Sequence, residues 1–415
     1  MAQRIMANAL YLSYDGMCDP LGGSQVLPYL GGLAARGHRI TLISFEKSAR
    51  TREERAAVGR LCATAGIEWR PLPYHKWPPL LSSFYDVRQM QRLAVRLHRN
   101  RPFDLVHCRS DLPALVGLSM KRRFAVPFIF DMRGFWADER VDGGIWNLSN
   151  PLFRFVYSYF KRREAEFLRE ADHVISLTEE GKRVLLDRRR DGPPISVIPC
   201  CVDYKAFPAV TAERRSEARR LLGIAPDAKV AAYLGSFGSW YMVNEMMDFF
   251  RVQLEQHPHA LFLIISREPA GDIIQAATRR GIPAERVIVR SASRDDVPRL
   301  VAAADYGLFF IKPVFSKKAS SPTKMGEFLA LELPIVTNGK VGDVSRIVEE
   351  SGAGVIVGGF SEDAYRTALD RLEALNPDMN RWRSVARTWF DLKTGVDRYA
   401  AIYLSLAPDR SPDRR

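Results

Sequence analysis

Two short apolar runs, residues 306–311 and 334–337, enclose a segment with helical periodicity, and this pattern constrains the fold more than any other part of the chain. Unbroken apolar runs of this length are typical of strands that are buried on both faces of a sheet. The sequence therefore predicts a strand, loop, helix and strand within residues 306–338. Similar alternation along the whole chain indicates an α/β fold with parallel sheets.

The helix in this unit has a well-marked start. Ser321 is a good N-cap, and Pro322 suits the first helical position, where a missing N–H costs nothing. The backbone N–H groups of Thr323 and Lys324 then lack intrahelical partners, and Lys324 adds a charge to the positive end of the helix macrodipole. This combination predicts an anion site at the helix start, suited to a diphosphate.

Glu327 shares one flank of the predicted helix with Thr323 and Lys324, because side chains three and four residues apart are neighbours. It lies about 7 Å along the axis from the cap, at a rise of about 1.5 Å per residue. Its carboxylate could accept hydrogen bonds from two hydroxyls of a ribose whose phosphates bind at the helix start. A capped structural helix with a surface lysine and glutamate is the alternative interpretation. The core-facing stripe comprises Met325, Phe328, Leu329 and Leu333.

This segment resembles the nucleotide-binding motif of glycosyltransferases of the family 4 type, which carry Glu-x7-Glu or a variant with Ser-Pro-Thr-Lys before the second Glu. Residues 321–324 read Ser-Pro-Thr-Lys and Glu327 matches the second Glu, whereas Ala319 replaces the first. The resemblance implies a GT-B architecture, in which two Rossmann-like domains face each other across a cleft. It also implies a retaining enzyme that needs no metal or other cofactor, because the leaving diphosphate takes the acceptor proton.

At 415 residues, 47% of them hydrophobic, the chain is too long for one core and predicts two domains. By the resemblance, residues 1–205 would bind the acceptor and residues 206–393 the nucleotide sugar. A helix near 394–406 is expected to pack back on the first domain, and residues 407–415 to fray. The first domain's expected strands are 7–14, 38–45, 67–72, 104–108, 127–132, 173–178 and 196–199. The second domain's are 229–235, 260–266, 286–289, 306–311, 334–337 and 354–357.

Small residues follow the first predicted strand of each domain. Gly22 and Gly23 lie in a loop where a ligand could approach the backbone closely, although the spacing is not the G-x-G-x-x-G of a nicotinamide dinucleotide site. Ser236, in the corresponding turn of the second domain, could donate a hydrogen bond to a phosphate. A plain turn is the alternative at the glycines, but the resemblance places a Gly-Gly against the donor. The expected donor-binding residues are Gly22, Gly23, Ser236, Ser321, Thr323, Lys324 and Glu327.

Asp131 and Arg133 end an apolar strand, at the carboxyl edge where α/β sheets bind ligands. Two residues apart, they direct their side chains to one face. The segment resembles the family stretch in which a strand ends in Glu-x-Arg-Asp or x-x-His-Asp beside the cleft, with Gly134 in place of the usual Asp. The resemblance implies catalytic roles, for Arg133 at the donor diphosphate and for Asp131 at the acceptor hydroxyl or the transferred sugar. A structural ion pair is the alternative.

Positive charge is concentrated in the first half of the chain. Residues 1–200 contain 31 Lys and Arg against 21 Asp and Glu, which accounts for +10 of the net +13. This imbalance indicates an anionic surface or substrate, and no nucleic-acid-binding motif accompanies it. An apolar stretch followed by arginines at helical spacing predicts contact with an anionic membrane, with an ordinary solvated helix face as the alternative. These residues are Trp77, Leu80, Leu81 and Phe84, then Arg88, Arg92, Arg96 and Arg99.

The cysteines, at positions 18, 62, 108, 200 and 201, have neither a disulfide framework nor metal-ligand spacing, so a reduced cytoplasmic compartment is expected. No signal peptide is evident, and the longest uncharged run, residues 20–35, is too short to cross a bilayer. Any attachment to the inner face of the cytoplasmic membrane is therefore expected to be peripheral.

The predicted function is transfer of a sugar from a nucleotide diphosphate to a glycan or a polyprenyl-diphosphate-linked glycan, in bacterial surface polysaccharide assembly. Two alternatives stay open. One is a catalytically silent GT-B-like binding subunit, which would have lost residues of the donor motif. The other is a sugar epimerase of the same fold, which would turn over without an acceptor.

Overall fold

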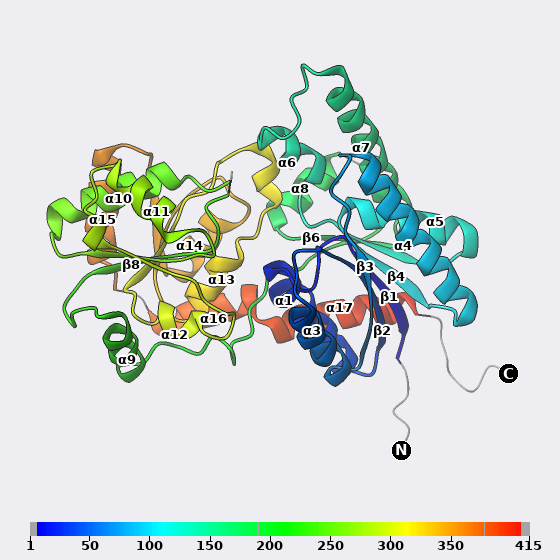
Figure 1. The fold of residues 1–415 in the computed structure, drawn as a ribbon, viewed down its shortest axis with the longest axis horizontal. Coiled ribbons are helices and arrows are strands. Elements are labelled where there is room, and N and C mark those ends of the chain that lie inside the picture. Colours follow the sequence, from blue (N-terminus) through cyan, green and yellow to red (C-terminus); the bar gives the residue numbers. More distant parts are fainter. Residues whose placement is uncertain (1–5, 189–190, 239, 377, 408–415) are drawn as a thin grey trace. The chain divides into compact units, whose positions relative to one another are not determined.

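The computed structural model describes residues 6–188, 191–238, 240–376 and 378–407 (Figure 1). The chain forms two compact units, one comprising the residues up to Pro199 together with those from Leu392 onward, the other Cys200–Asp391. The chain thus passes between units a few residues earlier than the boundaries expected from the sequence, 205/206 and 393/394. Apart from Ala407, the expected frayed tail, residues 407–415, lies outside the described residues.

The first unit is built on a seven-stranded parallel sheet of order β3-β2-β1-β4-β5-β6-β7. Every residue of β1, β4 and β5 is buried, as expected for central strands covered on both faces. The strands are β1 (Asn8–Ser13), β2 (Arg39–Glu46), β3 (Ile67–Pro73), β4 (Leu105–Arg109), β5 (Phe128–Asp131), β6 (His173–Ser176) and β7 (Ile195–Val197). The helices are α1 (Pro20–Gln25), α2 (Leu27–Ala35), α3 (Arg52–Thr64), α4 (Leu81–Asn100), α5 (Asp111–Phe124), α6 (Trp136–Asp142), α7 (Pro151–Glu170), α8 (Glu179–Asp187) and α17 (Leu392–Leu406).

The second unit repeats this plan with a six-stranded parallel sheet of order β10-β9-β8-β11-β12-β13. Its strands are β8 (Val230–Leu234), β9 (Leu261–Ile265), β10 (Val287–Arg290), β11 (Tyr306–Phe309), β12 (Ile335–Asn338) and β13 (Gly354–Val357). Its α-helices are α9 (Ala212–Leu222), α10 (Val243–Gln256), α11 (Ala270–Thr278), α12 (Val297–Val301), α13 (Thr323–Ala330), α14 (Val344–Ser351), α15 (Glu362–Glu373) and α16 (Met379–Phe390). Two short 3-10 helices, η1 (Ala284–Arg286) and η2 (Phe315–Ala319), complete it.

The order of the strands reverses at equivalent places in the two sheets, between β1 and β4 in the first unit and between β8 and β11 in the second. In open α/β sheets, ligands bind outside the carboxyl ends of the strands at such a switch point. The expected α/β class with two Rossmann-like domains is confirmed, and each predicted strand is present with ends that differ from the prediction by at most two residues. No described helix has the length and apolarity that a membrane crossing requires.

The glycine pair after β1 lies in the short helix α1 and not in the loop that the sequence predicted. A Cβ on Gly22 would meet the carbonyl oxygen of Gly16 at 2.3 Å and the Cα of Met17 at 2.5 Å. Gly22 therefore lets two backbone segments of the first unit pack closely. A Cβ on Gly23 would meet nothing within 4 Å, so only Gly23 leaves open space beside its backbone.

Candidate functional site

Helix α13 lies between β11 and β12, and its core-facing stripe is buried as predicted. The helix begins at Thr323 with Pro322 as the N-cap, so the prediction of Ser321 as N-cap was wrong. The hydroxyl of Ser321 instead accepts a hydrogen bond from the Cys200 N–H at 3.1 Å. Because this amide at the start of the second unit uses Ser321, the first N–H groups of α13 have no side-chain cap.

Lys324, in the first turn of α13, is only 5% exposed. Its Nζ lies 3.5 Å from the ring centroid of Tyr241 and 4.0 Å from that of Tyr233, and it has no hydrogen-bond partner among the described residues. Burial lowers the pKa of Lys324 well below its usual value, against the opposing effect of Glu327. A buried amine that lacks a partner and sits at the positive end of a helix is suited to receive an anionic ligand.

The turn after β8 borders this lysine. Gly235 has a φ of +118°, and a Cβ at this position would approach the Lys324 Nζ to 3.4 Å. Glycine therefore preserves space beside the amine. Ser236 is exposed, and its carbonyl accepts a hydrogen bond from the Tyr233 hydroxyl at 2.5 Å. Ser236, a predicted donor-binding residue, directly follows Gly235 in the chain and therefore lies near Lys324.

Glu327 is buried one turn further along α13 and forms an ion pair with Arg294. The Arg294 guanidinium also lies 4.5 Å from the ring centroid of Phe207, which holds it in place. The ion pair engages Oε1 of Glu327, so a ribose would share this carboxylate with Arg294. Sequence reasoning missed Arg294, because nothing in its local sequence distinguishes it from other arginines.

Ala319 replaces the first Glu of the motif and lies buried at the end of η2. Two residues earlier, Lys317 is also buried, with its Nζ 3.8 Å from the ring centroid of Trp240. Adjacent aromatic residues, Trp240 and Tyr241, thus each contact a buried lysine of the β11–α13 segment. Neither ring was predicted from the sequence to lie at the site.

Asp131 ends β5 and is almost fully buried within the first unit. Its Oδ2 accepts a hydrogen bond from the Tyr399 hydroxyl at 3.0 Å and lies 3.3 Å from His107 Nε2, while Oδ1 is 3.6 Å from Nη1 of Arg133. Burial opposes ionisation, but the Arg133 charge and the His107 hydrogen bond lower the pKa of Asp131 to about 2. Asp131 is therefore ionised at neutral pH, and the ion pair considered from the sequence is present.

His107 and two tyrosines of α17 complete this cluster. Burial lowers the pKa of His107, so the ring is neutral at neutral pH. Because the Asp131 carboxylate can only accept, Nε2–H of His107 donates to it, and Nδ1 accepts from the Tyr403 hydroxyl at 2.9 Å. Tyr399 and Tyr403, four residues apart on one helix, were both missed by sequence reasoning. Their partners lie hundreds of residues away, and no local signal links them.

Arg109 ends β4 and pairs in register with Asp131 of β5. Its Nε donates to Asp15 Oδ2 at 3.1 Å, and its buried Nη1 has no hydrogen-bond partner in the described part of the chain. Arg133 is close enough to repel it, whereas Asp15 and Asp131 attract it. Two guanidinium groups therefore lie at neighbouring strand ends of the first sheet, an arrangement suited to an anionic group. Sequence reasoning missed Arg109 as well.

The structure thus groups the predicted residues by unit. Thr323, Lys324 and Glu327 share helix α13, near Ser236 and Ser321, whereas Asp131 and Arg133 lie together at the end of β5 with Gly22 and Gly23 elsewhere in the same unit. Among the described residues, no group of three or more His, Cys, Asp or Glu side chains is arranged to hold a metal ion.

Comparison with known proteins shows which proteins this chain resembles. Residues 25–206 match the model of Glycosyltransferase Family 4. A D-inositol 3-phosphate glycosyltransferase from Mycobacterium marinum is 24% identical over 331 residues, which cover 77% of this chain and 67% of that protein. Sucrose-phosphate synthase from Thermosynechococcus elongatus has a similar structure, with a TM-score of 0.72 at 15% identity, over 96% of this chain and 99% of that one. Anabaena Alr3699/HepE, solved with UDP and glucose, has a TM-score of 0.69 at 16% identity, over 95% and 99%.

Two all-parallel sheets of the same strand order, joined in one chain, define the GT-B fold of these matching structures. Residues 25–206 resemble glycosyltransferases of family 4, and nearly the whole chain shares the fold of these solved structures.

Proposed function

We propose that this protein is a retaining glycosyltransferase that binds a nucleoside diphosphate sugar on its second unit and transfers the sugar to a hydroxyl of a glycan acceptor. The buried Lys324 amine carries the proposal, because it lies at the start of α13 without a hydrogen-bond partner among the described residues. Glu327 follows one turn later on the same helix. This spacing fits a diphosphate at the helix start and a ribose along its flank.

The proposed roles follow from the charges at each position. Lys324 and the first N–H groups of α13 bind the diphosphate, and Glu327 accepts hydrogen bonds from the ribose hydroxyls. The bond between the anomeric carbon and the phosphate oxygen breaks, and a bond to the acceptor oxygen forms on the same face. The leaving phosphate oxygen takes the acceptor proton. Arg133 stabilises the negative charge that builds on the leaving group, an electrostatic role that requires no protein nucleophile.

Asp131 has a different proposed role from the one that the resemblance suggested. Its carboxylate is engaged by Tyr399, His107 and Arg133. A fixed, ionised carboxylate orients the Arg133 guanidinium and keeps its counter-charge constant during turnover. We therefore propose that Asp131 positions Arg133, in place of the direct contact with the acceptor that the resemblance implied.

The acceptor is proposed to be a glycan or a lipid-linked glycan at the cytoplasmic membrane. The first unit presents apolar side chains beside arginines, with Trp77 75% exposed and Leu81 and Phe84 also exposed. Arg88, Arg92, Arg96 and Arg99 all lie on the exposed face of α4 and form no ion pair with a described residue. Such a surface favours peripheral attachment to an anionic bilayer, which would bring the enzyme to a lipid-linked acceptor.

Thermal-shift screening of nucleoside diphosphate sugars tests the donor assignment. A ligand at 100 times its dissociation constant stabilises the folded state by about 2.7 kcal/mol, which is readily measured. The expected ligand stabilises the wild type and stabilises Lys324→Met less at the same concentration. If no nucleoside diphosphate or its sugar conjugates stabilise the wild type, the proposal is wrong.

Turnover of the donor found in this way separates the remaining functions. A glycosyltransferase releases nucleoside diphosphate at a rate that depends on an acceptor. An epimerase would convert the sugar without one, and a silent binding subunit would bind the donor and leave it intact with every acceptor tried.

A further inference from the structure

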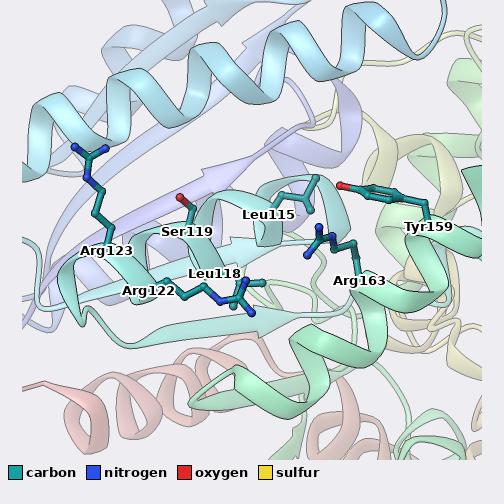
Figure 2. A pocket seen from close by; sticks show the side chains of 7 residues that line it. All are labelled: Leu115, Leu118, Ser119, Arg122, Arg123, Tyr159 and Arg163. Carbon is teal, nitrogen blue, oxygen red and sulfur yellow. The ribbon is translucent and has the colours of Figure 1, made fainter.

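A pocket of about 360 Å³ lies on the first unit between α5 and α7, away from the carboxyl edge of the sheet (Figure 2). Arg122 and Arg123 line it from the last turn of α5, and Tyr159 and Arg163 from α7. The floor is apolar, with Leu118 buried beneath it. The pocket therefore combines a basic wall with an apolar base.

The two facing arginines are held in fixed positions. Arg122 forms ion pairs with Glu166 and Glu170, and Arg163 forms one with Glu166, so a single carboxylate bridges α5 and α7. Arg123 forms no ion pair with a described residue, and its guanidinium lies 5.2 Å from the Phe124 ring centroid. Each guanidinium has five N–H donors, so a bridging carboxylate leaves donors for a second anion.

Helix α4 extends this basic pocket across the surface. Gln91 of α4 donates to Ser119 Oγ in the pocket wall at 2.6 Å, and the Phe84 ring lies 6.3 Å from that of Tyr159. The exposed arginine face of α4 starts at Arg88, one turn after Phe84. Asp86, the one acid in the α4 sequence, is buried and bonded to His75. No acidic side chain of α4 thus offsets its exposed arginines.

An exposed apolar rim adjoins the pocket on the α7 side. Phe155 is 64% exposed and lies one turn before Tyr159, and Leu152 is exposed at the start of the same helix. On the α4 side, Leu81 and Phe84 are exposed. Apolar rings and leucines around a basic pocket match the layering of a bilayer surface, where acyl chains lie just below anionic phosphates.

We propose that the α5–α7 pocket binds the headgroup phosphate of an anionic phospholipid while the apolar rim enters the bilayer interface. This inference rests on the peripheral attachment proposed above and adds a specific lipid site to it. Arg163, which faces Arg122 across the pocket, supplies the phosphate contact, and Arg123 adds positive charge at the opposite end of the pocket (Figure 2). Arg122 lies between them and is held by Glu166 and Glu170. Arginine suits this task because its planar fork binds two phosphate oxygens at once.

Vesicle co-sedimentation without nucleotide tests the site apart from glycosyl transfer. Phosphatidylcholine vesicles containing phosphatidylglycerol are compared with vesicles of matched surface charge that contain oleate instead. The wild type is expected to prefer the phosphatidylglycerol vesicles. The double variant Arg123→Gln/Arg163→Gln should lose that preference and bind about 25-fold more weakly, since each arginine at an anionic surface contributes about fivefold.

The matched control removes equal charge outside the pocket. Arg60 and Arg183 are exposed on α3 and α8, so Arg60→Gln/Arg183→Gln should keep the preference. Equal weakening in both double variants would mean diffuse attraction and would overturn the proposal. Leu115→Trp, which fills the pocket without changing charge, should also abolish the preference if it unfolds at the same temperature as the wild type.

Calorimetry with glycerol 3-phosphate distinguishes the source of the phosphate. Weak or absent binding of this soluble headgroup, with strong binding to phosphatidylglycerol vesicles, supports a lipid site. Tight binding of glycerol 3-phosphate that Arg123→Gln/Arg163→Gln abolishes, without any vesicle preference, would assign the pocket to a free phosphate compound and overturn the lipid proposal.

Discussion

The Nζ of Lys324 lies 3.5 Å from the centroid of the Tyr241 ring, buried and without a hydrogen-bond partner in the described part of the chain. Contact with an aromatic face offsets only part of the cost of removing an amine from water. In the protein without ligand, Lys324 is therefore a source of instability. Such a position is typical of binding sites, where stability is lower than the same fold could reach.

Lys324→Met should raise the free energy of unfolding without ligand and weaken nucleoside diphosphate binding by about 10-fold to 150-fold, the effect of losing one charge-assisted hydrogen bond. Chemical denaturation and calorimetry measure the two quantities. Lys205→Met removes an exposed lysine of the same unit and should change neither. Lower stability with unchanged affinity in Lys324→Met would mean that the lysine is structural.

Nucleotide binding should take up a proton in alkaline solution. Burial lowers the pKa of Lys324 in the free protein, and a bound diphosphate raises it again by favouring the charged form. Affinity should therefore fall as the pH rises above the free-state pKa. Calorimetry in buffers of different protonation enthalpy, from about pH 7 to 10, measures the uptake. It should disappear in Lys324→Met, and its absence from the wild type would contradict the assignment.

The same lowered pKa makes a prediction for the unliganded protein. Between the folded pKa of Lys324 and its unfolded value near 10.4, the unfolded state binds more protons. The free energy of unfolding of the wild type, compared with that of Lys324→Met, should thus increase with pH through this window. Parallel denaturation curves at each pH give the comparison, and a flat difference would show that Lys324 titrates normally.

Glu327 is expected to accept hydrogen bonds from the ribose hydroxyls of the nucleotide. Nucleotide analogues that lack these hydroxyls test this role directly. The wild type is expected to bind a nucleoside diphosphate about 10-fold to 150-fold more tightly than its 2′,3′-dideoxy analogue. In Glu327→Gln this ratio should fall towards one. Arg294→Gln, which releases the carboxylate from its ion pair, should preserve the ratio. If the wild type binds both ligands equally, Glu327 has no role at the ribose.

Arg133→Lys should reduce turnover by about 100-fold to 1000-fold while changing donor affinity little, because the stabilised charge develops in the transition state. A lysine keeps the charge and loses the planar fork. Turnover per active site, determined by titration, is the measurement. Near wild-type turnover would leave only the structural ion pair with Asp131.

Tyr399→Phe should lower the free energy of unfolding by about 1 to 3 kcal/mol, because the buried Asp131 carboxylate loses a hydrogen-bond donor. It should also slow turnover if Asp131 positions Arg133. Tyr403→Phe removes the neighbouring hydroxyl, which contacts His107 and not Asp131, and should affect stability more than turnover. Equal turnover in both variants and the wild type would contradict the positioning role.

Much of the fold follows from local sequence. A continuous apolar run such as residues 306–311 is buried on both of its faces only in a sheet that is covered on both sides. The positions of the strands can therefore be predicted before any tertiary contact is known. The helix that presents Lys324 and Glu327 is equally local, since its periodicity fixes both its core-facing stripe and the flank opposite. The α/β class and the helix at residues 323–330 were therefore predictable.

Contacts between distant segments could not be predicted from the local sequence. The local sequence specifies which residues α13 presents. The packing of distant segments pairs Arg294 with Glu327 and encloses Lys324 between Tyr233 and Tyr241. It likewise brought Tyr399 of the last helix to Asp131, across 268 residues. The physical reason is that periodicity and capping act over a few residues, whereas the surroundings of a buried charge depend on which strands and helices pack together.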